Sequence, residues 1–302
     1  MVILAFLQAM RPHQWVKNLL VFAPLLFAKL TLQTDAVLIS AIAFVLFCLL
    51  SSGIYLLNDV MDRERDALHP HKKDRPVAAG RLSVGVACAG SVALITGALA
   101  LGGVLVPYTS DATAVAKSSF IVWPVAYLLI NLAYSFWLKH VVIIDCVLIA
   151  LGFTVRVLAG AAALSVPASD WILLCTFFLA LFLAFCKRRE EVIKVADATG
   201  STRTTMREYD VPFLNQLISP LAALSILSYA LYTVAPETPH GPNLKFTVPM
   251  VVFCVFRYLF LVYRRQEGGD PARLIFRDVQ MLIGMLVWTA VAFWAMATTN
   301  LG

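Results

Sequence analysis

Long runs of apolar residues, separated by short polar segments, occupy almost the whole of this 302-residue chain. Most runs are close to the roughly 20 residues that an α-helix needs to cross a bilayer. The pattern therefore predicts an all-α integral membrane protein that forms a single domain over residues 1–302. The nine predicted spans are 14–32, 36–57, 82–106, 118–138, 141–163, 169–186, 212–234, 246–264 and 278–298.

The first predicted span, 14–32, is the weakest of these, because Lys17, Pro24 and Lys29 interrupt its apolar run. The residues before it lack the charged n-region and the small-residue cleavage site of a signal peptide. We therefore expect them to form a short helix at the membrane interface.

Composition and charge support this class of protein and orient it. Hydrophobic residues make up 60% of the chain and charged residues 14%, whereas a soluble protein has about a quarter charged residues. The long polar connections 58–81, 187–211 and 265–277 all fall on one side of the predicted bundle, and they carry most of the Lys and Arg residues. The positive-inside rule places that side in the cytoplasm. The net charge of +6 thus reflects topology; it predicts no nucleic-acid partner, although it suits an anionic substrate.

The six cysteines are scattered singly within or beside the apolar runs, at Cys48, Cys88, Cys146, Cys175, Cys186 and Cys254. None belongs to a Cys-x-x-Cys pair or a Cys/His cluster, so we expect neither a zinc site nor a disulfide framework. They are typical of small buried apolar residues.

One polar segment, "NDVMDRERDALHPHKKDRPVAAG" at residues 58–80, places acids directly after an apolar run. If the second helix continues through it, Asp59, Asp62 and Asp66 line one helix face. Like charges at that spacing repel unless a cation compensates them. Mg²⁺ is one candidate, because it prefers oxygen ligands and commonly joins one or two carboxylates to a substrate's phosphates. The alternative is a solvated loop with local ion pairs.

The basic part of this segment supplies groups suited to phosphate oxygens, namely Lys72, Lys73 and Arg75. Alone, these residues could be an ordinary topology signal. Beside an acidic helix face they indicate the second half of a magnesium–diphosphate site. His69 and His71 flank a proline and have no metal-ligand spacing, so we interpret them as solvated loop residues.

"NDVMDRERD" resembles the N-D-x-x-D-x-x-x-D signature of the UbiA superfamily of intramembrane prenyltransferases, and "HKKDRPVAAGRLS" resembles that family's continuation. The resemblance covers nearly the whole chain. It implies a bundle of nine helices with the active-site cleft on the cytoplasmic side. It also implies that Asp59, Asp62 and Asp66 bind Mg²⁺.

Typical members of the superfamily carry a second motif, D-x-x-x-D, after the sixth helix, and this chain has "CKRREEV" there instead. That segment, "MRPHQWVKNLLVFAPLLFA" and "YSFWLKHVVIIDCVLIALGFTVRVLAG" resemble the branch that makes decaprenylphosphoryl-5-phosphoribose. The resemblance implies a phosphoribosyltransferase that uses phosphoribosyl pyrophosphate and a polyprenyl monophosphate in a bacterial inner membrane. Cell-wall biosynthesis would use the product.

The resemblance and the charge pattern together give a set of candidate site residues. The candidate catalytic residues are Asp62, Asp66, Lys139 and Lys187. The candidate substrate-binding residues are Lys17, Asn58, Lys72, Arg75, Tyr134, Asp145, Arg156, Arg188, Glu191 and Tyr209. The candidate metal ligands are Asp59, Asp62 and Asp66. Glu191 is expected to contact the ribose or the metal.

Asp145 and Arg156 lie in the fifth predicted span, where ionisable residues usually face a bundle interior or cavity. They are eleven residues apart, which is three helical turns, so they share a face but are too far apart for a direct salt bridge. They either line a polar cleft or bond neighbouring helices. Arg257 either reaches the interface or binds a ligand, and Asp210 is a candidate helix cap.

Two other function classes remain open at this point. One is a conventional prenyltransferase that transfers a polyprenyl group to an aromatic acceptor, which the missing second Asp motif argues against. The other is a transporter, whose buried charges would lie near the bilayer midplane instead of on one cytoplasmic face. Small residues at Gly152, Ala159 and Gly160 allow close helix packing, either within the chain or in a homo-oligomer.

Overall fold

The structure is a computed structural model that describes residues 2–28, 30, 33–68, 72–105, 114–196, 208–235, 242–269 and 271–298. Within these ranges the chain forms helices, turns and bends, and no strand. The chain divides into two compact units. The first, here called the N-terminal unit, comprises Met1–Lys139, Val155–Pro167 and Thr199–Ser201. The second, the C-terminal unit, comprises His140–Thr154, Ala168–Ala198 and Thr202–Gly302.

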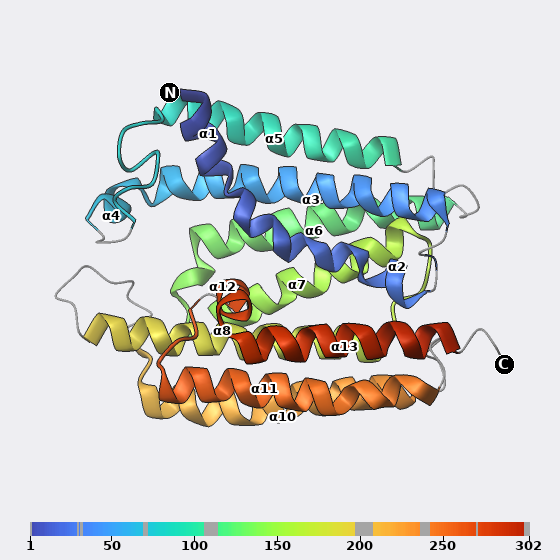
Figure 1. Ribbon diagram of the computed structural model, residues 1–302. Helices are drawn as coiled ribbons and strands as arrows, with labels where there is room; N and C mark the ends of the chain where they lie inside the picture. The colour runs from blue at the N-terminus through green and yellow to red at the C-terminus, as the bar shows by residue number, and fades with distance from the viewer. Residues whose placement is uncertain are drawn as a thin grey trace. The chain divides into compact units, whose positions relative to one another are not determined.

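The N-terminal unit is built around two long helices that lie side by side (Figure 1). Its elements are α1 (Val2–Met10), η1 (Pro12–Phe22), α2 (Ala23–Phe27), α3 (Thr34–Met61), α4 (Arg63–Ala67), α5 (Val84–Leu105), α6 (Ala114–Phe136) and the second half of α7 (Ile144–Ala163). Helix α3 packs along α5 and also contacts η1 and α6. Leu46, Phe47, Leu50 and Phe120 are fully buried in the core that these helices share.

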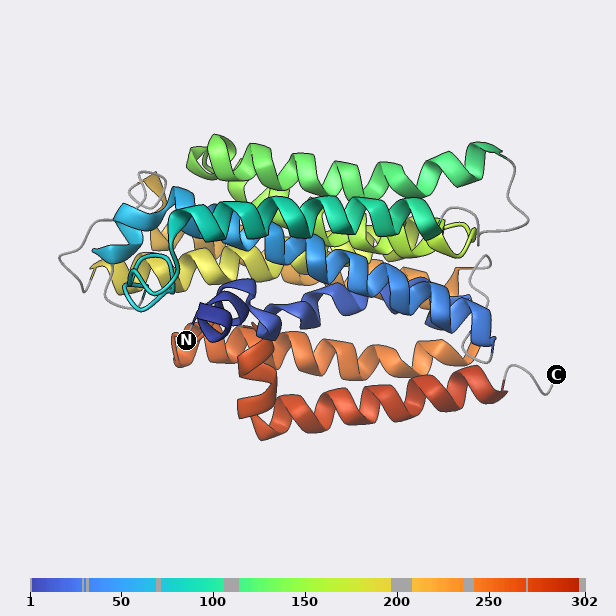
Figure 2. The same ribbon diagram turned by 90° about the horizontal axis from the view of Figure 1, so that it is seen from above.

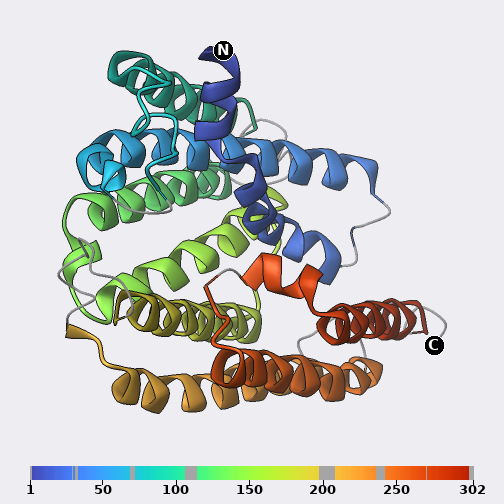
Figure 3. The same cartoon turned by 60° about the vertical axis from the view of Figure 1, so that its left-hand side comes forward.

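Helix α1 lies across one end of α3 and α5 (Figure 3). Ala5 and Ala9 are buried there against Leu56, while Ile3 and Leu4 on the other side of α1 are exposed. A helix with one packed face and one exposed apolar face suits a membrane interface. The interfacial position expected from the sequence stays a prediction, which the exposed apolar residues of α1 support.

The C-terminal unit contains the first half of α7 and the later helices. These are α8 (Asp170–Ala196), α10 (Val211–Val234), η4 (Pro242–Thr247), α11 (Val248–Arg264), α12 (Pro271–Arg277) and α13 (Val279–Thr298). Helix α8 packs along α10, and α11 packs against both α10 and α13. Short α12 runs across the direction of α13 (Figure 2). Phe182, Leu214, Ile218 and Leu261 are fully buried in this unit's core.

Six helices among the described residues are long and apolar enough to cross a membrane, and two shorter apolar helices cover Phe120–Phe136 and Val279–Ala295. The chain is therefore a multi-pass membrane protein. The prediction of one helix over 14–32 is wrong, because a 3-10 helix occupies Pro12–Phe22 and a five-residue α-helix follows it. Helix α8 also continues to Ala196, beyond its predicted end at 186. The count of nine spans stays a prediction.

Candidate functional site

The three aspartates of the acidic segment lie at the end of α3 and in α4, each beside a basic side chain of the N-terminal unit. Asp59 contacts Arg11, and its Oδ1 also lies 3.4 Å from Nη1 of Arg75. The same Arg75 nitrogen donates to Oδ2 of Asp66 at 2.6 Å. Asp59 and Asp66 therefore converge on one guanidinium. We call the three aspartates, together with their cations Arg11, Arg75 and Lys139, the acidic cluster.

The third aspartate pairs with a different cation. Nζ of Lys139 donates to Oδ1 of Asp62 at 2.9 Å, and Lys139 is only 5% exposed. Lys139 follows α6, in the short 3-10 helix η3 (Leu138–His140). A buried ammonium is costly without a negative partner, so this pair ties the end of α6 to the acidic segment.

A break in the helix at Asp62 separates the carboxylates. A shared face for the three aspartates required the second helix to continue through the segment, and that condition is not met, because α3 ends at Met61 and α4 begins at Arg63. The backbone still turns helically, since the amide of Asp62 donates to the carbonyl of Asn58 and the amide of Asp66 donates to the carbonyl of Asp62. Asp59 and Asp66 are buried, whereas Asp62 lies at the break and is turned to Lys139.

A compact turn sets the position of Arg75. Its amide donates to the carbonyl of Lys72, and its carbonyl accepts from the amide of Ala79. Gly80 ends the turn at a φ of 71°, a left-handed conformation that glycine adopts without steric cost. The basic part of the segment thus folds back so that one arginine reaches two aspartates.

The acidic cluster can be tested for its fit to a metal ion. Oδ2 of Asp59 is buried and has no hydrogen-bond partner, so one carboxylate oxygen is available to a cation. Among the described residues, however, no group of three or more acidic, histidine or cysteine side chains is arranged to share a metal. Two converging carboxylates suit Mg²⁺, which commonly takes one or two from the protein and the rest from phosphates. The assignment of all three aspartates as ligands stays a prediction.

Deeper in the N-terminal unit, Arg156 is held by neutral polar side chains. Its Nε donates to Oδ1 of Asn18 at 2.8 Å and its Nη2 donates to the hydroxyl of Tyr127 at 2.7 Å. Asn18 in turn donates to the hydroxyl of Ser51 on α3. These bonds join η1, α3, α6 and α7, so the structural interpretation of Arg156 is confirmed, and its binding role stays a prediction.

In the C-terminal unit, Asp145 is the centre of a second polar cluster. It is fully buried, and its Oδ2 accepts from Nε of Arg188 at 2.7 Å. Its Oδ1 accepts from the hydroxyl of Tyr209 at 2.8 Å, and that hydroxyl accepts from the amide of Ile143 at 2.7 Å. Arg188 also contacts Glu191, and Lys187 lies 4.0 Å from Glu191. We call Asp145, Arg188, Glu191 and Tyr209 the Asp145 cluster.

Tyr209 acts in this cluster as a neutral donor. Burial, the largest cause, together with the nearby thiol of Cys146 and the carboxylate of Asp145, raises the pKa of Tyr209 far above its ordinary value. The hydroxyl therefore stays protonated and donates to Asp145 throughout the physiological range. Ile143 is held at a φ of 70°, a rare conformation for a β-branched residue, where its amide meets the Tyr209 oxygen.

Glu190 and Arg189, which the sequence left unassigned, join elements of the C-terminal unit. Glu190 contacts Lys194 and accepts from the amides of Gly268 and Gly269 in the loop after α11. Arg189 donates to Oδ1 of Asn215 on α10 and to the carbonyl of Val262 on α11. These contacts hold the C-terminal end of α8, which is predicted to face the cytoplasm, against its neighbours.

Two residues left open by the sequence have clear structural roles. Asp210 accepts from the amide of Phe213 at 2.6 Å, so its role as the N-cap of α10 is confirmed. Arg257 makes a two-point contact with Asp278, with Nε to Oδ1 at 3.1 Å and Nη2 to Oδ2 at 2.7 Å. This hydrogen bonding, more than any other cause, lowers the pKa of the Asp278 carboxyl. Arg257 is thus an internal ion-pair partner.

The remaining candidates also lie on the N-terminal unit. Lys17, Asn58, Lys72 and Tyr134 are half-buried on η1, α3, the turn before α5 and α6. His69 and His71 lie outside the described residues. Sequence reasoning gave Arg11 no place in the candidate site and missed its contact with Asp59, because the two residues are 48 positions apart. The segment "MRPHQWVKN" was the signal that could have marked it.

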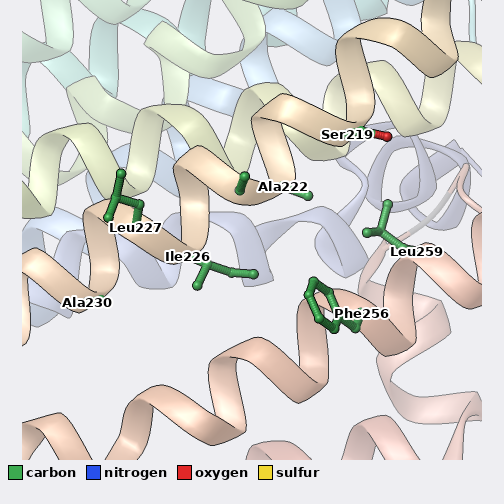
Figure 4. A pocket seen from close by; sticks show the side chains of 8 residues that line it. Ser219, Ala222, Ile226, Leu227, Ala230, Phe256 and Leu259 are labelled. Carbon is green, nitrogen blue, oxygen red and sulfur yellow. The ribbon is translucent and has the colours of Figure 1, made fainter.

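An apolar cavity of about 490 Å³ lies between α10 and α11 in the C-terminal unit (Figure 4). Figure 4 shows Ile226 and Phe256 facing it from the two helices, with small residues such as Ala222 and Ala230 along α10. None of its lining side chains is ionisable. The cavity is therefore unsuited to binding phosphate, unlike the two polar clusters.

Comparisons with known proteins agree with the family resemblance drawn from the acidic segment. The sequence profile of the UbiA prenyltransferase family matches residues 19–277. The decaprenyl-phosphate phosphoribosyltransferase of Corynebacterium glutamicum is 34% identical over 291 residues, covering 93% of this chain and 83% of that protein. The Mycobacterium tuberculosis protein of the same name is 32% identical over 300 residues, covering 96% of this chain and 93% of that one.

A solved structure shares the fold. A UbiA homologue from Archaeoglobus fulgidus bound to GPP and Mg²⁺ superimposes with a TM-score of 0.71 at 18% identity, covering 97% of this chain and 99% of that one. The resemblance drawn from the N-D-x-x-D-x-x-x-D segment is thereby confirmed. Because the family profile covers most of the chain and the two relatives align along nearly all of it, the chain belongs to the UbiA prenyltransferase family of enzymes.

Proposed function

We propose that the protein transfers 5-phosphoribose from phosphoribosyl pyrophosphate to a polyprenyl monophosphate, with decaprenyl phosphate as the expected lipid. The observation that carries this proposal is the acidic cluster, in which Asp59, Asp62 and Asp66 each contact a base and Asp59 keeps one oxygen without a partner. Carboxylates interleaved with guanidinium and ammonium groups suit a diphosphate that arrives with a divalent cation.

The choice of donor rests on two further points. The names of the relatives aligned along nearly the whole chain specify phosphoribosyl transfer to decaprenyl phosphate. In addition, the place of a second Asp motif is taken by the basic and acidic residues that follow Cys186. There Arg188 is engaged by buried Asp145 in a cation-rich site, which differs from a second pair of metal-binding carboxylates.

In the proposed reaction, the bond between the anomeric carbon and the pyrophosphate oxygen breaks, and the leaving pyrophosphate keeps the electron pair. An oxygen of the lipid phosphate forms the new bond to that carbon. This phosphate is largely ionised at neutral pH, because its second pKa is about 6. The acceptor therefore needs no dedicated base, consistent with a cluster made of acids already paired to cations.

The residues of the acidic cluster have distinct proposed roles. Asp59 and Asp66 would hold Mg²⁺ with the donor, and Asp62 would complete the site. When bound, the metal would neutralise charge on the leaving pyrophosphate. Arg75 and Lys139 would bind phosphate oxygens once released from the aspartates, lowering the barrier by stabilising the charge that develops there.

The Asp145 cluster and the other predicted binding residues keep their assignments as proposals. Lys187 and Arg188 would contact phosphate groups, and Glu191 would contact the ribose or the metal. Tyr209 supports Asp145 and, through it, the position of Arg188. We further propose that both clusters face the cytoplasm of a bacterial inner membrane, because the basic loops predict that orientation.

The deciding experiment uses purified protein in detergent with Mg²⁺, decaprenyl phosphate and phosphoribosyl pyrophosphate labelled in the ribose. We expect label to enter the organic phase only when Mg²⁺ is present. Asp62→Asn should reduce the rate at least about 100-fold, as expected when a group that stabilises a transition state is removed. Glu64→Gln is the matched control, because Glu64 is an exposed acid of the same segment and should leave the rate unchanged.

Two results would contradict the proposal. One is transfer from a polyprenyl diphosphate to an aromatic acceptor with none from phosphoribosyl pyrophosphate, which would make the protein a conventional prenyltransferase. The other is an Asp62→Asn variant as active as wild type, which would remove the acidic cluster from the reaction.

A further inference from the structure

Arg11 occupies a corner of the N-terminal unit that is built to hold one side chain in place. It joins α1 to η1 with φ 54° and ψ 60°, the left-handed region. That conformation costs a residue with a side chain about 1–2 kcal/mol relative to a right-handed helix. Strain of this kind persists only where surrounding contacts impose it, and it is concentrated at functional sites.

The contacts that impose this corner come from α3. The hydroxyl of Ser52 donates to the carbonyl of Met10 at 3.0 Å, and the indole of Trp15 donates to the same hydroxyl at 3.0 Å. The backbone is therefore tied to α3 on both sides of Arg11. The backbone at Arg11 is thus held by contacts that do not involve the Arg11 side chain.

From this corner the Arg11 side chain runs along α3 to the acidic cluster. Its guanidinium carbon lies 5.1 Å from the ring centre of Tyr55, and Nη2 contacts Oδ1 of Asp59. The same oxygen lies 3.4 Å from Arg75, while Oδ2 of Asp59 has no hydrogen-bond partner. Two guanidinium groups thus share one oxygen and leave the other unused.

This arrangement is poor for an arginine–carboxylate pair, whose favoured form uses two parallel hydrogen bonds. Among the described residues, Asp59 is the only side chain that Arg11 hydrogen-bonds. A guanidinium has five N–H donors in a fixed fork, which matches the oxygens of a phosphate as well as those of a carboxylate. The geometry leaves donors of Arg11 available beside the oxygen of Asp59 that has no partner.

We propose that Arg11 is a phosphate-binding residue of the donor site, and that in the empty protein Asp59 takes the place of the donor's phosphate. This inference rests on the proposed function only in requiring a diphosphate bound with a divalent cation. When Asp59 binds that cation, its ion pairs with Arg11 and Arg75 weaken, and the two guanidinium groups become available to the diphosphate. Conversely, when the diphosphate binds the guanidinium groups, Asp59 becomes available to the cation. Divalent cation and diphosphate should consequently bind with positive, reciprocal coupling.

The test measures binding of inorganic pyrophosphate to the purified full-length protein in detergent, by calorimetry with and without saturating Mg²⁺. We expect Mg²⁺ to strengthen pyrophosphate binding at least about tenfold in wild type, within the usual range of coupling. Arg11→Gly should weaken pyrophosphate binding about 10- to 100-fold, as expected for a hydrogen bond to a charged group. Glycine accepts the left-handed corner, so this variant removes the guanidinium without adding strain.

Two further variants make the result specific. Arg11→Lys keeps the charge but not the fork, and it should bind pyrophosphate with intermediate affinity; it also serves if the glycine variant does not fold. Arg81→Gln removes an exposed arginine of the same unit that bonds Gln8 and the carbonyl of Asp74. It should bind pyrophosphate as wild type does. In turnover, Arg11→Lys should raise the KM for the donor and leave the KM for the lipid unchanged.

The inference is overturned if Arg11→Gly, or Arg11→Lys in its place, binds pyrophosphate as tightly as wild type, or if wild type binds none. These outcomes are separate from the phosphoribosyl assay. Loss of pyrophosphate binding in the Arg11 variants of a protein that transfers no phosphoribose would uphold the role of Arg11 and refute the proposed donor. Phosphoribosyl transfer by a protein whose Arg11 variants bind pyrophosphate normally would uphold the proposed donor and refute the role of Arg11.

Discussion

At the residue scale, Asp145 has lost all contact with water, so its charge depends on the groups that donate to it. It receives hydrogen bonds from Arg188 and Tyr209, one on each oxygen. Tyr209 also accepts from the amide of Ile143, which is held in a left-handed conformation. One hydroxyl therefore satisfies a buried carboxylate and a strained backbone amide together.

Tyr209→Phe should lower the free energy of unfolding by about 1–3 kcal/mol, because it leaves a buried carboxylate oxygen and a backbone amide each without a partner. Thermal unfolding in detergent, followed by tryptophan fluorescence, measures the effect. Tyr263→Phe is the matched control, because the hydroxyl of Tyr263 is buried with no hydrogen-bond partner among the described residues. Its removal should be neutral or stabilising. Equal destabilisation by the two variants would contradict this account.

At the element scale, the short α2 and η1 approach α7 so closely that one glycine is required. A Cβ added at Gly160 would collide with the carbonyl oxygen of Val21 and would lie 3.2 Å from Cδ of Pro24. The sequence indicated that the small residues around Gly160 allow close packing, but left open whether the neighbour is in the same chain. For Gly160 the neighbour is the chain's own N-terminal segment.

Gly160→Ala should consequently destabilise the protein by about 1–3 kcal/mol, as overpacking against backbone usually does. Gly97→Ala on α5 is its control, since nothing lies within 4 Å of the added Cβ there. Alanine in an exposed helix interior is favoured over glycine by about 1 kcal/mol, so this control should raise the unfolding temperature. A Gly160→Ala variant that unfolds at the wild-type temperature or above it would contradict the close approach to Val21.

The differences between prediction and structure at this scale have a common cause. Apolar runs located the later long helices to within a few residues but not the short α4 and α12, which lie in segments predicted to be polar connections. They also missed the end of α8, where the ion pair of Glu190 with Lys194 accompanies the continuation of the helix beyond the apolar run. They failed over 14–32 because periodicity does not distinguish a 3-10 helix from an α-helix. The break at Asp62 was not predictable from the apolar runs, because it accompanies a contact with Lys139, 77 positions away.

At the scale of the whole molecule, the basic loops predict that the acidic segment faces the cytoplasm and that the loop before α11 faces the opposite side. Single cysteines introduced as Arg63→Cys in α4 and Lys245→Cys in η4, in a background without the native cysteines, would test this. Both native residues are exposed. A membrane-impermeant maleimide should label the first only in inside-out vesicles and the second only in right-side-out vesicles. Labelling of both from one side would contradict the predicted topology.

The family was predictable from the sequence, whereas the contacts within the candidate site were not. Spacing in the acidic segment indicated carboxylates suited to Mg²⁺ and nearby bases suited to phosphate. It could not indicate that Arg75 joins Asp59 to Asp66, or that Asp62 turns to Lys139, because these contacts depend on how separate helices meet. The contact of Arg11 with Asp59 was not predictable for the same reason.

The pairing of acids with bases in the acidic cluster also has a consequence for how the protein is made. A new chain enters the membrane before it meets any substrate, and an isolated buried charge costs several kcal/mol. Asp62 reaches the amine of Lys139 only after α6 has been synthesised and packed, since the two residues are 77 positions apart. A nascent chain that ends before Lys139 therefore lacks the amine that contacts Asp62 in the finished protein, so the pairing at the end of α3 is completed only late in synthesis.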